Sequence, residues 1–152
     1  MAYRIVDEPA PSALKQMTVN PFWPLLASMF AGAWLAWPWF VLNSLALGRG
    51  RRFDFDLAVL ALGFALNAAL VLAVEKVLAA GIIQHRQYAD LVPQAARLTV
   101  LYIVFLRQQR TFQLFEHFGG VGRNGLWIVF AGSVVRGQVL SHVPPLFRML
   151  LA

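Results

Sequence analysis

Charged residues are unevenly spaced along this sequence, and the longest gap between them extends from Lys15 to Arg49. The gap contains the segment NPFWPLLASMFAGAWLAWPWFVLNSLALG, which is apolar and rich in tryptophan. A helix needs about 20 apolar residues to cross a hydrocarbon layer roughly 30 Å thick. The segment therefore predicts one membrane-spanning helix, which begins at Pro21 and ends or kinks at Pro38, because proline disrupts a helix interior.

A second apolar run extends from Leu57 to Val74, and Asn67 is its one strongly polar residue. This run predicts a second spanning helix. The two runs are joined by the short basic segment Gly48-Arg-Gly-Arg-Arg52. Because short connections join neighbouring elements, we expect the two helices to form an antiparallel hairpin.

The second half of the chain is less hydrophobic, and its uncharged stretches, such as residues 98–106 and 124–135, are short. Two interpretations are open: membrane helices that bury their polar groups against protein, or helices that lie along the membrane surface. We favour the first, because the glycine-rich segment from Gly119 to Gly125 is typical of a tight turn between helices. The sequence then predicts an all-α integral membrane bundle of about four transmembrane helices over residues 20–152, after a polar tail over residues 1–19.

The composition agrees with a membrane location. Hydrophobic residues make up 59% of the chain and charged residues 13%, and the mean hydropathy is +0.62; soluble domains average about 25% charged residues. The formal charge of +6 indicates contact with anionic lipid headgroups rather than with nucleic acid. The residues expected to contact headgroups are Arg49, Arg51, Arg52 and Arg123. The positive-inside rule puts the connections that carry these arginines in the cytoplasm and both termini outside, as in a multi-pass protein of a bacterial inner membrane.

Small residues recur every four positions on both apolar runs. The first row consists of Ser28, Gly32 and Ala36, and the second, the alanine row, of Ala61, Ala65, Ala69 and Ala73. Lipid supplies no hydrophobic drive for helices to associate, so close packing through small residues has to stabilise the contact. We expect the two rows to pack against each other; the alternative is that one of them docks a second copy or another subunit.

A polar seam follows one face of the third predicted helix. At spacings of three and four residues it contains Thr99, Tyr102, Leu106, Gln109, Gln113 and Glu116. Polar side chains at membrane depth need protein or water partners. We favour a hydrogen-bonded interface between helices; a solvent-facing extension of the helix and the lining of a water-filled pore are the alternatives.

The sequence carries no recognisable catalytic, cofactor or metal motif. It has no cysteine, and His85, His117 and His142 are too scattered to suggest a zinc site. The spacing Gly120-x-Gly-x-x-Gly125 matches a dinucleotide-binding fingerprint, but no acidic residue follows Glu116 to bind a ribose. We therefore predict a protein that is not an enzyme and that uses no cofactor and no metal.

These patterns favour a small multi-spanning membrane protein that acts as a non-enzymatic subunit of a homo- or hetero-oligomeric assembly. Burial against other chains would make the weakly hydrophobic second half of the chain tolerable in a membrane. Its expected partners are the lipid bilayer and itself or other membrane subunits. Two alternatives remain: a small oligomeric channel or transporter lined by the polar seam, and an immunity or regulatory protein that binds one membrane partner.

Overall fold

The computed structural model describes residues 14–48, 51–83 and 85–151, and these residues form helices and no strand. In chain order the helices are the 3-10 helix η1 (Lys15–Met17), α1 (Phe22–Phe30), α2 (Ala33–Leu47), α3 (Arg51–Ala79), α4 (Arg86–Ala89), α5 (Leu91–His117), α6 (Leu126–Ser141) and α7 (Pro145–Leu151). The predicted all-α class is confirmed.

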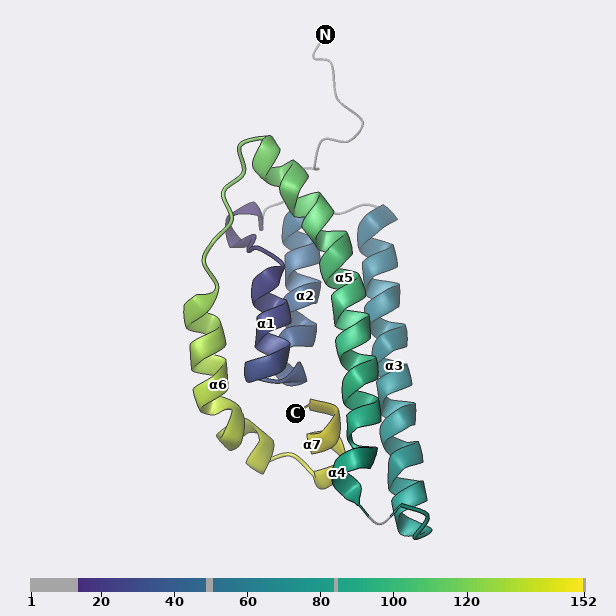
Figure 1. The fold of residues 1–152 in the computed structure, drawn as a ribbon. Helices are drawn as coiled ribbons and strands as arrows, with labels where there is room; N and C mark the ends of the chain where they lie inside the picture. The colour runs from purple at the N-terminus through teal and green to yellow at the C-terminus, as the bar shows by residue number, and fades with distance from the viewer. Residues whose placement is uncertain (1–13, 49–50, 84, 152) are drawn as a thin grey trace.

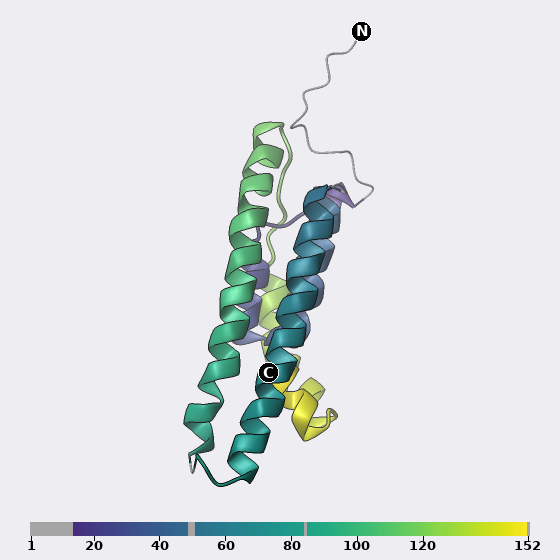
Figure 2. The same cartoon turned by 90° about the vertical axis from the view of Figure 1, so that its right-hand side faces the viewer.

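Two long helices, α3 and α5, lie side by side and antiparallel (Figures 1 and 2). α3 has 29 residues and α5 has 27. The helices approach each other closely at Gly63, where an added Cβ would overlap the side chain of Val100. Among the described residues, two helical stretches are long and apolar enough to cross a membrane: Asp54–Ala79 in α3, and Arg86–His117 in α4 and α5.

The first apolar run is not one helix, and the single spanning helix predicted there is wrong. α1 ends where the backbone N–H groups of Ala31 and Gly32 both donate to the carbonyl of Ala27. Gly32 has φ 102 and ψ 175, a conformation that is essentially restricted to glycine. The chain reverses at this residue, and α2 packs against α1 as the second arm of a hairpin (Figure 1). Pro38, where the helix was expected to end or kink, lies inside α2.

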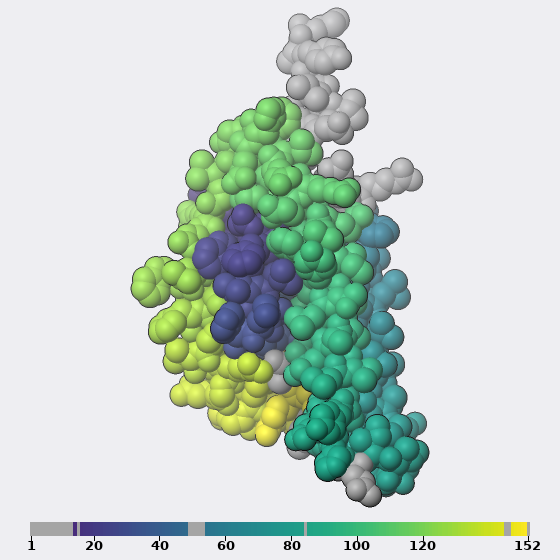
Figure 3. All heavy atoms as spheres, in the orientation of Figure 1, coloured from purple at the N-terminus to yellow at the C-terminus, as the bar shows by residue number. Residues whose placement is uncertain are grey.

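The α1–α2 hairpin shares one core with the long helices. α2 contacts α3 and α5, while α1 contacts α5 and α6. Figure 3 shows α1 at the surface on one face of the molecule, with α5 and α6 on either side of it. The main apolar cluster lies where α2 meets the long helices and consists of Ala33, Ala36, Trp37, Phe40, Leu60, Leu101 and Val104.

The end of the predicted polar tail belongs to the folded body. Thr18 and Val19 are buried, and the N–H of Arg123 donates to the carbonyl of Thr18 at 2.8 Å. This contact ties η1 to the connection between α5 and α6. The rest of the predicted tail lies outside the described residues. α7 lies at the other end of the bundle, where it packs against α3 and α2 (Figure 1).

Candidate functional site

A chain of hydrogen bonds links α2, α3 and α5 in the interior of the molecule. Its residues are Asn43, Ser44, Asp56, Arg107 and Gln108, which we call the buried network. Asn43 and Gln108 are each 1% exposed, Ser44 is 5% exposed and Asp56 is 7% exposed. Arg107 is half-buried and ends the chain of bonds at the surface. The network is therefore a polar cluster between α2, α3 and α5 in a mainly apolar core.

Helical periodicity explains why these side chains point inward. The buried residues in the C-terminal part of α5 are Leu101, Val104, Gln108, Phe112 and Phe115. Their spacings of three and four residues put them on one face of the helix. On α2, Asn43 and Ser44 follow the fully buried Phe40 by about one turn and so face the same core.

Gln108 contacts α2 with both ends of its side-chain amide. Its Nε2 donates to the carbonyl of Phe40 at 2.9 Å and to Oγ of Ser44 at 2.6 Å. Its Oε1 accepts a hydrogen bond from Nδ2 of Asn43 at 3.0 Å. Oδ1 of Asn43 in turn accepts from the backbone N–H of Val19 at 3.0 Å. Protein partners thus replace the water that these two amides lose on burial, which offsets most of the desolvation cost.

Ser44 connects Gln108 to an ion pair between α3 and α5. The Ser44 hydroxyl donates to Oδ2 of Asp56 at 3.4 Å, and Oδ1 of Asp56 accepts from Nε of Arg107 at 2.8 Å. The guanidinium carbon of Arg107 lies 4.0 Å from the ring centre of Phe55. Cation–π attraction in this geometry adds to the ion pair and fixes the direction of the Arg107 side chain.

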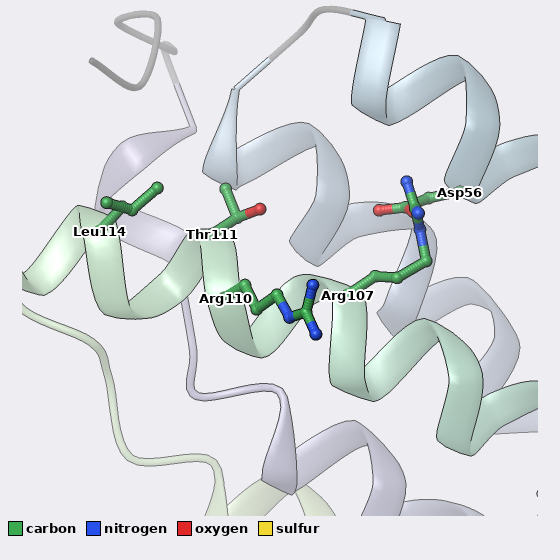
Figure 4. Close-up of a pocket in the computed structure, with 5 residues that line it drawn as sticks. All are labelled: Asp56, Arg107, Arg110, Thr111 and Leu114. Atoms are coloured by element: carbon green, nitrogen blue, oxygen red, sulfur yellow. The ribbon is translucent and has the colours of Figure 1, made fainter. Parts of the chain in front are cut away.

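A pocket of about 340 Å³ opens beside this ion pair. Its lining residues are Asp56, Arg107, Arg110, Thr111 and Leu114. Figure 4 shows Arg107 extending from α5 to Asp56 on α3, with Arg110 and Thr111 on the next turn of α5. Two guanidinium groups and one carboxylate line the pocket, so it has a net positive charge and favours anionic over cationic ligands.

Asn43 also lines a second pocket, of about 400 Å³. This pocket is mainly apolar, with Leu35, Trp39 and Leu42 from α2 and Arg123 from the connection before α6 among its lining residues. The buried network therefore joins an apolar pocket at Asn43 to a positively charged pocket at Asp56 and Arg107.

The geometry of the buried network suits a structural role. Its bonds join the α1–α2 hairpin to both long helices, and a saturated polar network inside a low-dielectric core makes one arrangement of helices more stable than its alternatives. The carboxylate of Asp56 is held by Arg107 and Ser44. The three histidines are exposed. Within residues 14–48, 51–83 and 85–151, no group of three or more His, Asp and Glu side chains is placed to hold a metal ion.

The polar seam lies on the outward side of α5. Thr99, Tyr102, Gln113 and Glu116 are exposed, and Gln109 is half-buried. Within this chain the seam does not form the expected interface between helices, because α5 is rotated so that Gln108, one residue away from Gln109, faces the core. The other interpretations of the seam stay predictions.

The two rows of small residues do not pack against each other, and that prediction is wrong. Ser28, Gly32 and Ala36 are buried, whereas Ala61, Ala65, Ala69 and Ala73 are exposed. The face of α3 that meets the bundle carries Leu60, Gly63, Asn67 and Val71 instead. Gly63 selects this face, because it lets Val100 of α5 approach the backbone of α3. Docking of the alanine row on another chain stays a prediction.

The arginines predicted to contact headgroups are described only in part. Arg49 and the side chains of Arg51 and Arg52 lie outside the described residues. Arg123 is exposed, between the end of α5 and the beginning of α6.

Sequence reasoning missed the buried network. A signal was present, because Asn43 and Ser44 are polar residues within an uncharged run, and such residues need partners in a membrane. The partner residues, Asp56 and Gln108, could not be assigned without knowing how α3 and α5 are rotated.

Comparisons of the chain with known protein families, with curated proteins and with solved structures find no match. The fold and the site define the class instead: an all-α chain with two helices long and apolar enough to cross a membrane, joined to a helical hairpin through a buried polar network.

Proposed function

We propose that this protein is a membrane-embedded, non-enzymatic subunit of an oligomeric assembly. The outward face of α3 carries the proposal. Only 22% of the most apolar part of this helix is buried within the chain, and the exposed residues include Leu62, Phe64, Leu66 and Leu72. In water, so large an exposed apolar surface would be unfavourable unless another protein covered it. In a membrane it needs no such cover, because lipid tails are as apolar as leucine.

In this proposal α3 and α5 cross the membrane and the α1–α2 hairpin is re-entrant. α1 has 9 residues and α2 has 15, which correspond to about 14 and 22 Å of helix, less than the roughly 30 Å of a hydrocarbon core. A non-helical turn is tolerated at membrane depth when protein buries it, and Gly32 is buried. The hairpin then enters and leaves the membrane on the same side.

The distribution of basic residues supports one orientation in the membrane. η1, the beginning of α3 and the connection between α5 and α6 lie at one end of the bundle (Figure 1). The basic residues in and around these segments include Lys15, Arg51, Arg52, Arg110 and Arg123. The positive-inside rule puts this end in the cytoplasm, so in a bacterium the protein would lie in the inner membrane.

Two outward features favour assembly over an isolated monomer in lipid. The polar seam lies on α5, and its members Thr99 and Tyr102 are exposed within the proposed span, where polar side chains need partners. The alanine row lies on α3, where small exposed residues allow close approach of another helix. A neighbouring subunit would supply partners for these polar side chains and a close-packing surface for the alanine row, whereas lipid would supply neither.

The test is to express the full chain, extract it with a mild detergent and determine the protein mass of the detergent complex. We expect the chain in the membrane fraction, and a protein mass above the 16.9 kDa of one chain. Recovery in the soluble fraction without detergent would contradict the membrane location. A complex of one chain alone would contradict assembly but leave the membrane location intact.

A second function, a small channel or transporter, is favoured by the exposure of Tyr102, Gln113 and Glu116 on one side of α5. An oligomer with these side chains around its axis would enclose a polar path. Replacing Gln109 and Gln113 together by leucine should then reduce ion flux into liposomes, while Gln138→Leu on the exposed surface of α6 should not. If liposomes containing either variant showed the same ion flux as empty liposomes, the channel function would be contradicted.

A further inference from the structure

Three side chains that line the pocket beside Asp56 have donor groups without a partner. Arg107 uses its Nε for the bond to Asp56, and its two Nη groups make no hydrogen bond to a described residue. The guanidinium of Arg110 and the hydroxyl of Thr111 also have no hydrogen-bond partner in the described part of the chain. In Figure 4, Arg110 extends along α5 in the direction of Arg107, and the hydroxyl of Thr111 points in the direction of Asp56. The pocket thus collects donors that the described chain does not use.

The charged groups that line this pocket leave one positive charge in excess. Asp56 and Arg107 form an ion pair, and the second carboxylate oxygen of Asp56 accepts from Ser44. Arg110 is exposed, and no ion pair to it occurs among residues 14–48, 51–83 and 85–151. A ligand with one negative charge and several acceptor oxygens would match the charge of Arg110 and accept from all three donor groups.

Arg107 is held in position before any ligand binds. Its guanidinium carbon lies 4.0 Å from the ring centre of Phe55. Its ion-pair partner Asp56 is buried and is itself held by Ser44. A side chain fixed in this way loses little conformational entropy when it binds a ligand. One of the two guanidinium groups of the pocket is therefore preorganised for an anion.

The pocket lies at the end of the bundle where α3 begins and α5 ends. The apolar stretch of α3 begins at Asp54, so Asp56 lies about 3 Å inside this stretch along the helix axis. The lining residues of α5 extend from Arg107 to Leu114, close to the end of the helix at His117. In the proposed membrane arrangement the pocket is therefore at the level of the cytoplasmic headgroups, where a lipid or a solute can reach it.

We propose that Arg107, Arg110 and Thr111 bind a phosphate group in this pocket, either a free phosphate or the phosphodiester of an anionic lipid. Guanidinium N–H groups match the oxygens of a phosphate in geometry and charge. The pocket volume of about 340 Å³ is at the low end of the roughly 300 to 1,000 Å³ of small-molecule sites, which suits one headgroup. Basic pockets between membrane helices on the cytoplasmic side commonly hold such headgroups. The lipid source rests on the membrane location proposed above, whereas binding of free phosphate does not.

The test uses the purified full chain in a non-ionic detergent, freed of lipid, and two probes. The midpoint of thermal unfolding is followed against inorganic phosphate concentration, with chloride keeping the ionic strength constant; a ligand of the folded state raises this midpoint. Native mass spectrometry then counts the molecules of phosphatidylglycerol that each chain retains, and we expect one. A response to phosphate alone assigns the site to a soluble phosphate, and a response to phosphatidylglycerol alone assigns it to a lipid. Binding of both shows that the phosphate group is the part that is recognised.

Variants of the pocket separate a built site from general attraction to positive charge. Arg110→Gln removes the excess charge but no bond of the buried network, so the variant should fold, and Kd for the bound probe should rise about tenfold or more. Thr111→Val removes one donor at constant charge and should raise Kd about two- to tenfold. Arg148→Gln is the matched control, because it removes an exposed arginine from α7, at the other end of the bundle, and should leave Kd unchanged.

Two results would overturn the proposal. The first is that the wild type binds neither inorganic phosphate nor phosphatidylglycerol, or binds them with a Kd that Arg110→Gln leaves unchanged. The second is an equal loss of binding in Arg110→Gln and Arg148→Gln with Thr111→Val unchanged, because any exposed arginine would then serve equally well.

Discussion

Gln108 joins α5 to α2 through three hydrogen bonds. Because Gln108 is buried, water cannot replace a partner that is lost. A buried polar group left without a partner costs about 1 to 3 kcal/mol. Removing the Gln108 amide would strand Nδ2 of Asn43, the partner of Oε1. It would also remove the donor that Ser44 and the carbonyl of Phe40 accept from.

Gln108→Leu should therefore lower the free energy of unfolding by about 2 kcal/mol or more, measured by chemical denaturation in detergent. The neighbouring Gln109→Leu is the control, because Gln109 is half-buried and its Oε1 is already without a partner in the described chain. It should change the unfolding free energy by no more than about 0.5 kcal/mol. Equal losses for the two variants would contradict the assigned rotation of α5.

At the residue scale, the sequence alone could not show that Gln108, and not Gln109, faces the core. Gln109 belongs to a polar row at helical spacing, and Gln108 belongs to an inward row of apolar residues at the same spacing. Periodicity gives the faces of a helix but not which face meets the bundle. Arg97, which is buried on the inward face of α5, was visible as a charge in a weakly apolar segment, yet its burial depends on the same unknown rotation.

At the scale of elements, Gly32 decides whether the first apolar run is one helix or two. Gly32→Ala puts a Cβ on a backbone with φ 102 and ψ 175, which should destabilise the fold by about 1 to 3 kcal/mol. In a straight helix the same substitution would instead stabilise by up to about 1 kcal/mol. The sign of the change in unfolding free energy thus distinguishes the hairpin from a continuous span.

Gly137→Ala is the control for that measurement. Gly137 lies in α6, and an added Cβ there has no atom within 4 Å. We expect this variant to be neutral or up to about 1 kcal/mol more stable. Stabilisation by both substitutions would contradict the turn at Gly32.

The two faces of α3 should respond differently to added volume. Gly63→Leu forces a side chain against Val100 and should destabilise the α3–α5 pair by about 1 to 3 kcal/mol. Ala65→Leu adds volume to the exposed alanine row, so it should leave the unfolding free energy nearly unchanged and reduce the mass of the detergent complex. A complex of unchanged mass in Ala65→Leu would remove the alanine row as an assembly surface.

The sequence predicted some helices better than others, and the reasons are physical. The second apolar run gave α3 correctly, because a long uncharged stretch with helical spacing has few alternatives. The first run was misread, because every residue around Gly32 is apolar and no polar signal marks the reversal. α5 was underestimated: Arg107 looks like a break in hydropathy but is paired with Asp56 inside one continuous helix.

The proposed arrangement of the whole molecule in a membrane depends on the α1–α2 hairpin being re-entrant. A straight first span would put η1 and the beginning of α3 on opposite sides of a membrane. A re-entrant hairpin puts them on the same side, together with the connection between α5 and α6 (Figure 1). Because the chain contains no cysteine, single cysteines can report on each connection without interference.

The most direct test is labelling of single-cysteine variants in sealed membrane vesicles with a membrane-impermeant maleimide. Exposed positions are available at each connection: Met17 in η1, Asp54 near the beginning of α3, Val121 after α5 and Ile82 after α3. We predict that the cysteines at 17, 54 and 121 are labelled from the same side and the cysteine at 82 from the other. Labelling of positions 17 and 54 from opposite sides, or of all four from both sides, would contradict the two-span arrangement with a re-entrant hairpin.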